Sequence, residues 1–118
     1  MCDYRGITML AIETFIKPEV FNILQALKPR LADDGNICYA VLFGSYARSE
    51  AVITSDIDIA IVAEDPLSVD RAKLREVTES SDIVCDLVYT THEALASATR
   101  ELDVNYWIKK EGIVIWQR

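Results

Sequence analysis

Two neighbouring segments decide the fold, LFGSYAR at residues 42–48 and SDIDIAIV at residues 55–62. The first is the end of an apolar run over 37–43 that turn residues bound, so it predicts a buried strand. The second is rich in Ile and Val and predicts another strand over 56–63. The segment 44–54, which begins at Gly44, breaks the apolar pattern and is expected to hold a short helix. The polar residues of both segments therefore stand at the ends of buried strands.

Asp56 and Asp58 are two residues apart on the second predicted strand. Side chains alternate along a strand, so both carboxylates share one face, with their α carbons roughly 6.5–7 Å apart. That spacing suits two metal ions about 3.5–4 Å apart. Asp is depleted in strands, and two like charges repel unless a cation lies between them. The alternative is a solvated edge strand whose polar face simply carries acids.

A phosphate site is indicated where the first strand ends. Gly44 allows close backbone approach, Ser45 offers a hydroxyl, and Arg48 adds a cation about one turn further on. The alternative is a plain strand–turn–helix junction with Ser45 as the helix N-cap. A third acid, Asp86, interrupts the apolar run 83–89, where a carboxylate is costly to bury unless it is paired or binds metal. Taken together, these groups favour a two-metal phosphoryl-transfer site.

The other predicted elements interleave helices with strands, giving three or four strands in a sheet that helices cover on at least one face. They are a helix that starts at Pro18 and ends or kinks at Pro29, a short helix within 44–54, a helix over 66–80, a strand over 83–89, a helix that starts near Thr91 with Thr90 and Glu93 as a capping box, a helix over 103–110 and a strand over 113–116.

Length and composition predict one globular domain. The chain has 118 residues, 51% of them hydrophobic, and a net charge of -7. The acid excess does not favour a long nucleic-acid partner, which normally meets a basic face. No apolar run approaches the roughly 20 residues of a membrane span, and the N-terminus lacks the blocks of a signal peptide. Three cysteines without metal-type spacing, two of them inside apolar runs as small buried hydrophobes, predict a reducing, cytoplasmic setting.

Residues 42–62 resemble the signature of the DNA polymerase beta-type nucleotidyltransferase superfamily, in which Gly-Ser precedes an acid–apolar–acid strand and a later third acid. From about residue 18 to the end, the chain resembles the minimal nucleotidyltransferases of prokaryotes, including its closing segment KEGIVI at 110–115. Family members commonly have Gly after the Arg of the first motif, where this chain has Ser49. The substitution affects loop geometry and removes no chemical group.

The resemblance implies an α+β fold, with a small mixed β-sheet flanked by helices, in a nucleotidyltransferase domain over 17–118 that follows an arm over 1–16. It implies that Asp56 and Asp58 bind two Mg²⁺ ions, or Mn²⁺, and that Asp86 completes the metal shell and helps deprotonate the acceptor. Gly44 and Ser45 would hold the triphosphate of ATP, and Arg48 would support the phosphate or the loop. The implied partner is a HEPN-domain toxin, held in a hetero-oligomer and modified on a tyrosine, so that the chain acts as antitoxin.

Two other functions stay open. The chain could neutralise a partner by contact as a binding module, or transfer a nucleotide to a small molecule such as an antibiotic, although its length leaves little room for an acceptor domain. Among the remaining residues, Tyr46 is a candidate ligand contact because it lies beside Ser45, and Trp107 is expected to pack rather than stack on a base. The cluster Arg71-Lys73-Arg75 is either a solvated helix face or a partner contact.

Overall fold

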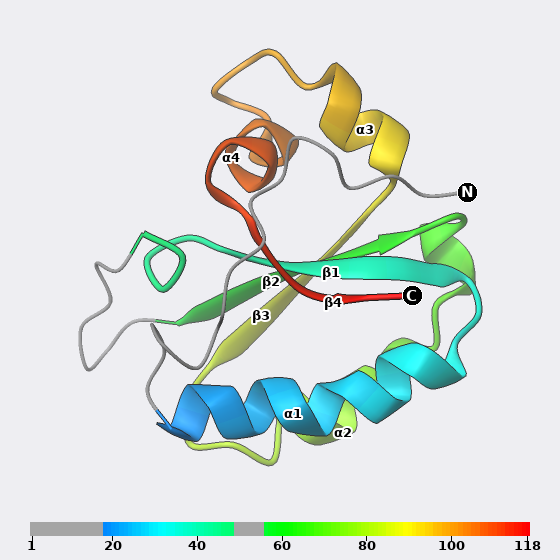
Figure 1. Ribbon diagram of the computed structural model, residues 1–118, viewed down its shortest axis with the longest axis vertical. Coiled ribbons are helices and arrows are strands. Elements are labelled where there is room, and N and C mark those ends of the chain that lie inside the picture. The colour runs from blue at the N-terminus through cyan, green and yellow to red at the C-terminus, as the bar shows by residue number, and fades with distance from the viewer. Residues whose placement is uncertain (1–17, 49–55) are drawn as a thin grey trace.

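Four strands form one mixed sheet in a computed structural model that describes residues 18–48 and 56–118. The strands lie in the order β3-β2-β1-β4 (Figure 1). They are β1 (Ile37–Phe43), β2 (Ile57–Ala63), β3 (Cys85–Thr90) and β4 (Ile113–Gln117). β1 pairs antiparallel with both β2 and β4, whereas β2 and β3 run parallel. The expected α+β fold with a small mixed sheet is confirmed.

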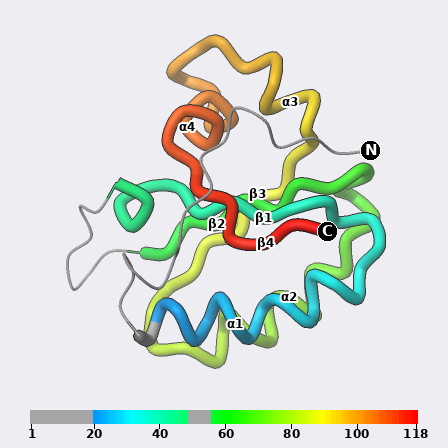
Figure 2. Tube along the Cα trace, viewed as in Figure 1, coloured from blue at the N-terminus to red at the C-terminus, as the bar shows by residue number. Residues whose placement is uncertain are grey.

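Helices cover both faces of the sheet. On one face lie α1 (Pro18–Asp33) and α2 (Arg71–Thr78), and on the other lie α3 (His92–Ser97) and α4 (Val104–Glu111) (Figures 1 and 2). α2 belongs to the crossover between the parallel strands β2 and β3, which needs a connection of this length. β3 and β4 are the outer strands of the sheet within the described residues.

The alternation of side chains along β2 divides the core. Ile57, Ile59 and Ile61 face α1 and α2 and belong to the larger apolar cluster. Ala60 and Val62 belong to the smaller cluster beneath α3 and α4. All five are fully buried, and burying an aliphatic side chain of this size contributes about 1.5–3 kcal/mol. This burial holds the strand that carries Asp58 rigidly in place.

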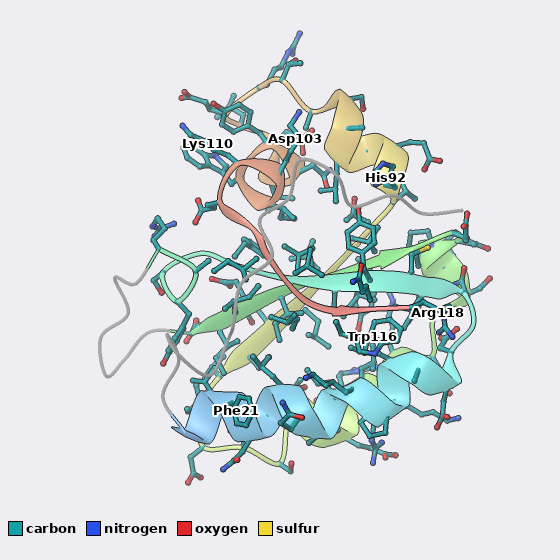
Figure 3. The ribbon with its side chains drawn as sticks, in the orientation of Figure 1. Phe21, His92, Asp103, Lys110, Trp116 and Arg118 are labelled. Atoms are coloured by element: carbon teal, nitrogen blue, oxygen red, sulfur yellow. The ribbon has the colours of Figure 1, made fainter. Side chains whose placement is uncertain are left out.

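Pro29 was predicted to end or kink the first helix, and the first of these alternatives is wrong, because α1 continues to Asp33. A proline inside a helix costs about 3 kcal/mol through a lost hydrogen bond and a steric clash. Leu31 is fully buried against the sheet and favours one more turn. The Arg118 guanidinium also donates to the carbonyls of Leu31, Ala32 and Asp34 at the end of this helix, and its place beside α1 is visible in Figure 3.

The predicted helix over 66–80 is divided into a short 3-10 helix, Pro66–Ser68, and α2. Each part has its own N-cap: the Asp65 carboxylate accepts from the Leu67 N–H, and the Asp70 carboxylate accepts from the Lys73 N–H. Two caps so close together make the chain restart its helix.

The helix predicted near residue 91 is confirmed, with its cap one residue later than expected. Thr91 caps α3 by accepting from the Ala94 N–H, whereas Thr90 is the last residue of β3 and donates to the Asn105 side chain. The predicted short helix within 44–54 is a turn over 45–48 in its described part.

Several predictions fall outside the described residues: the arm over 1–16, the rest of the 44–54 segment and the substitution at Ser49. The expectation that Cys38 and Cys85 are simply buried hydrophobes is only partly met. Both are partly buried, but Cys38 is disulfide-bonded and Cys85 keeps a free thiol. The cytoplasmic setting stays a prediction. Across residues 18–48 and 56–118, no helix has the length and apolar character needed to cross a bilayer.

Candidate active site

The three predicted carboxylates gather at one end of the sheet. Asp58 in β2 lies directly beside Asp86 in the parallel strand β3, and Asp56 immediately precedes β2. Neighbouring strands are about 4.8 Å apart, and residues paired in this way point to the same face. That face carries α3 and α4, because Ala60 and Val88, which continue the same alternation, pack toward them. The parallel pairing thus brings together two acids that are far apart in sequence.

The electrostatics of Asp58 show how closely the charged groups approach. Burial is the largest cause that raises the pKa of the Asp58 carboxyl, and the neighbouring charges of Asp86, Asp56 and Glu111 raise it further. Among the residues that the structure describes, only Arg48 acts in the opposite direction and lowers the pKa. The site therefore carries a negative charge that its own cation does not balance.

The negative charges of Asp86 and Asp58 also affect Cys85, which lies on the other side of β3. Burial, Asp86 and Asp58, in that order, raise the pKa of the Cys85 thiol to about 12. A thiol with that pKa stays protonated at neutral pH and is a poor nucleophile. Cys85 packs against the core on the α1 and α2 side and takes no part in the chemistry of the site.

Gly44 lies against the Asp58 carboxylate. Its φ angle is 79°, in the left-handed region that L side chains rarely adopt. A β carbon at this position would lie 2.3 Å from Oδ2 of Asp58, which is closer than real contacts allow. Both facts require glycine, so the turn can bring its backbone to the acids. The Arg48 N–H closes the turn by donating to the Gly44 carbonyl.

Glu111, the last residue of α4, is a fourth acid at the site that sequence reasoning missed. One of its carboxylate oxygens accepts from the Gly44 N–H at 3.1 Å and pairs with the Arg48 guanidinium at 2.7 Å. Its side chain is only 12% exposed. The signal that could have found it is its position, because a carboxylate at a helix C-terminus meets the negative end of the helix dipole and needs a compensating cation.

The predicted phosphate-site residues have different surroundings. Ser45 is partly exposed next to Gly44, as a phosphate contact requires. Arg48 is exposed but paired with Glu111, so it braces the turn. Tyr46, proposed as a ligand contact, is instead 5% exposed and part of the core beneath α1. The apolar ring fills the inner side of the turn, which rules out a ligand role for this tyrosine.

The donor set of the site fits a hard cation in its chemistry. Asp56, Asp58 and Asp86 offer only carboxylate oxygens, which Mg²⁺ and Mn²⁺ prefer, and their mutual repulsion would be relieved by positive charge. Within the described residues, however, no three His, Cys, Asp or Glu side chains stand close enough to surround one ion. Metal binding would therefore require the exposed carboxylates of Asp56 and Asp86 and the half-buried carboxylate of Asp58 to turn toward one another.

Two hollows flank the acids. One lies at the β3 edge, holds about 360 Å³, and is lined by Asp86 together with residues of α2 and β3. The other lies between α4 and the turn after β1, holds about 500 Å³, and is lined by Phe43, Gly44, Arg48, Val104, Trp107 and Glu111. Trp107, expected to pack, is 36% exposed in the wall of the second hollow. The acids thus sit between one polar hollow and one apolar hollow.

The sheet, the carboxylates and the glycine turn are those of a nucleotide-transferring domain. The family described as polymerase beta, nucleotidyltransferase matches residues 25–118. The chain belongs to this family.

Known proteins similar to this chain include a named protein adenylyltransferase and a chain of a toxin–antitoxin complex. A protein of Methanocaldococcus jannaschii that carries the name of a protein adenylyltransferase is 41% identical over 70 residues. That match spans 59% of this chain and 66% of the relative's length. A crystal structure of a toxin–antitoxin complex with AMP-PNP has a chain that matches 85% of this one with 26% identity and a TM-score of 0.54, over 72% of its own length.

A second solved complex joins the tri-AMPylated HEPN toxin of Shewanella oneidensis to an MNT antitoxin. One of its chains matches 85% of this chain at 27% identity and a TM-score of 0.53, over 73% of its own length. The resemblance to minimal nucleotidyltransferases that partner HEPN toxins is thereby confirmed.

Proposed function

We propose that the chain transfers AMP from ATP to a hydroxyl group of a protein, and that it uses divalent metal held by Asp56, Asp58 and Asp86. The observation that carries this proposal is the pairing of Asp58 with Asp86 beside the Gly44 turn. One small site then contains the paired carboxylates, a backbone turn that can approach phosphate, and the neighbouring hydroxyl of Ser45. The names of the relatives support an adenylyl group as the cargo.

Each residue has a distinct task in the reaction. Gly44 and Ser45 hold the triphosphate, and the Arg48–Glu111 pair keeps their turn in place. Asp86 takes the proton of the acceptor hydroxyl as its oxygen attacks the α-phosphorus. The bond between that phosphorus and the bridging oxygen breaks, and pyrophosphate leaves with the electron pair. Bound metal supplies positive charge that neutralises the phosphates in the transition state.

The acceptor we propose is a tyrosine of a HEPN-domain toxin bound in a hetero-oligomer, with the chain as antitoxin. The support is the toxin–antitoxin context of the matched structures. A partner of this kind brings the accepting hydroxyl to the site.

The experiment uses α-labelled ATP, Mg²⁺ and a HEPN-domain partner, and measures label on the partner. Asp58→Asn should reduce transfer roughly 100-fold, because it removes charge stabilisation at the reacting phosphate. Asp82→Asn is the matched control, since Asp82 is exposed and lies outside the site. Neutralisation of the partner without any label would favour the binding module. Full transfer by Asp58→Asn would refute the site.

A further inference from the structure

The hollow at the β3 edge lies on the α2 side of the outer strand and reaches Asp86 around that strand, whereas Asp58 and Asp86 share the face beneath α3 and α4. In strand order, Asp58 lies between the Gly44 turn, which follows β1, and Asp86 on the outer strand β3. In-line displacement puts the attacking and leaving oxygens on opposite sides of the phosphorus. If the triphosphate lies on the Gly44 turn, the attacking hydroxyl arrives over β3. The hollow, which Asp86 also lines, then lies next to the acceptor, around the edge of the outer strand.

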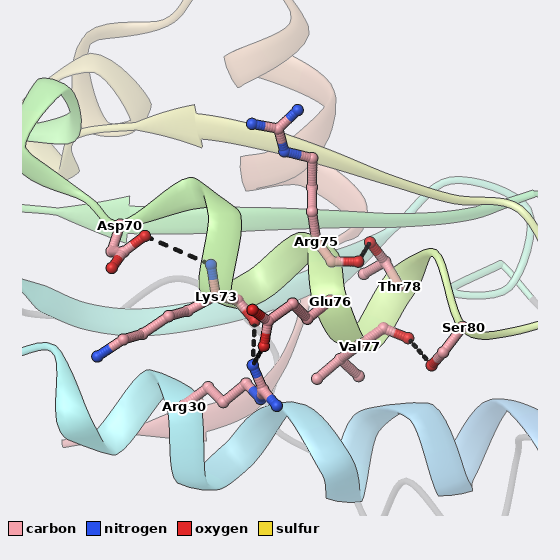
Figure 4. A network of polar contacts seen from close by, with 8 residues as sticks. All are labelled: Arg30, Asp70, Lys73, Arg75, Glu76, Val77, Thr78 and Ser80. Atoms are coloured by element: carbon pink, nitrogen blue, oxygen red, sulfur yellow. Dashed lines mark hydrogen bonds and ion pairs between the residues drawn. The ribbon is translucent and has the colours of Figure 1, made fainter.

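Two arginines place positive charge in the wall of this hollow, although the chain as a whole is acidic. Arg71 and Arg75 lie one helical turn apart on α2 and both line the hollow. The Arg71 guanidinium stacks on the Tyr89 ring at 4.1 Å from the ring centroid, which fixes its position. Figure 4 shows Arg75 extending from α2 on the side away from α1. In a chain with a net charge of -7, two neighbouring cations are a notable concentration.

An arginine of α1, by contrast, is paired within the protein. Arg30 of α1 pairs with Glu76 and donates to the Lys73 carbonyl, which ties α1 to α2 (Figure 4). Arg71 and Arg75 form no ion pair with any carboxylate of residues 18–48 or 56–118. Glu79 lines the same hollow without pairing with them. Their charges are therefore available to an outside group.

We infer that Arg71 and Arg75 bind an acidic side chain next to the accepting hydroxyl, so that the enzyme selects a hydroxyl within an acidic stretch of polypeptide. The inference rests on the proposed function, because it places the acceptor at Asp86. A carboxylate near the hydroxyl meets the guanidinium pair, which offers several donors in a geometry that suits carboxylates. The contact also offsets the repulsion between an acidic acceptor and the carboxylates of the site.

The test compares two peptides, a tyrosine flanked by glutamates and a tyrosine flanked by lysines, as acceptors of labelled AMP. Wild type should modify the glutamate peptide at least tenfold more efficiently, and the double variant Arg71→Glu plus Arg75→Glu should reverse the preference. Lys73→Glu is the matched control, because Lys73 lines a different hollow toward α1. Arg71→Lys plus Arg75→Lys, with a melting temperature for each variant, separates loss of charge from loss of folding.

Three outcomes overturn the inference. Wild type shows no preference between the peptides, or charge reversal leaves the preference unchanged, or it raises the KM for ATP and leaves the KM for the peptide unaltered, which would assign the arginines to the donor phosphates. Peptide binding is also measured by fluorescence polarisation with the non-hydrolysable ATP analogue AMP-PNP. If nothing is labelled, the proposed function fails, while the binding of the two peptides still decides whether the arginines recognise acid.

Discussion

Asp58 is a partly buried carboxylate with three acidic neighbours and one basic neighbour. Burial raises the pKa of its carboxyl most, and Asp86, Asp56 and Glu111 raise it further. Within residues 18–48 and 56–118, Arg48 is the only group that lowers it. Gly44 approaches the same carboxylate from the neighbouring strand end. A folded protein tolerates such crowding where function requires it, so this residue connects the stability of the domain to its chemistry.

The raised pKa of Asp58 predicts a definite dependence of stability on pH. Between the ordinary value of 3.8 and the raised pKa, the folded state binds more protons than the unfolded state. The stabilising effect of protonation is therefore complete below 3.8 and is lost as pH rises through the raised pKa. At neutral pH without metal, Asp58→Asn should be more stable than wild type.

The size of this gain is about 1 kcal/mol or less, because solvent screens a partly exposed carboxylate. Thermal unfolding at several pH values checks it, and the gain should vanish as pH falls toward 3.8. Mg²⁺ should raise the melting temperature of wild type and leave that of Asp58→Asn unchanged. A variant less stable than wild type at neutral pH would mean that Asp58 is not destabilised by its neighbours.

At the level of elements, the site depends on the junction between α4 and β4. Glu111 ends α4, and its carboxylate ties the helix to the turn that follows β1 through the Gly44 N–H and the Arg48 guanidinium. Gly112 follows without room for a side chain, because a β carbon would lie 2.3 Å from the Ile108 carbonyl oxygen. The helix is thereby held close against the sheet where the acids lie.

Glu111→Gln should destabilise the fold by about 1–2 kcal/mol, because it removes the charge that pairs with Arg48 and weakens the bond from Gly44. Relief of repulsion with Asp58 offsets only part of this loss, since that charge is more distant. AMP transfer should fall as well, since the turn loses its brace. Chemical denaturation and the transfer assay measure both effects, with the exposed Glu101→Gln as control. Unchanged stability would show that the pair contributes nothing to the turn.

The sequence allowed part of this element-level picture to be predicted. Alternation along the strand predicted one face for Asp56 and Asp58. β2 forms one residue later than expected, so Asp58 lies in the strand and Asp56 lies just before it. Asp86 was picked out because an acid inside an apolar run needs a reason, and its pairing with Asp58 gives one. Glu111 could not be found in this way. Its place at a helix C-terminus is its local signal, while its contacts with Gly44 and Arg48 depend on how α4 packs against the sheet.

At the scale of the whole molecule, one sheet separates two helical layers, and the acids occupy the face beneath α3 and α4. The apolar periodicity predicted this class of fold, because the fold class depends on the local spacing of apolar residues and on their burial. The division of the 66–80 helix and the continuation of α1 past Pro29 were not predicted, because side-chain caps and long-range contacts from Arg118 decide them. Local rules thus identify the layers, and tertiary contacts set where each element stops.

The central claim is that Asp56, Asp58 and Asp86 hold the divalent metal of a nucleotidyl-transfer reaction. The most direct measurement is an anomalous difference map from crystals grown with Mn²⁺ and a non-hydrolysable ATP analogue. We expect Mn²⁺ about 2.1 Å from carboxylate oxygens of these residues, with the triphosphate on the Gly44 turn. Mn²⁺ bound only elsewhere, or bound unchanged in Asp58→Asn crystals, would contradict the claim.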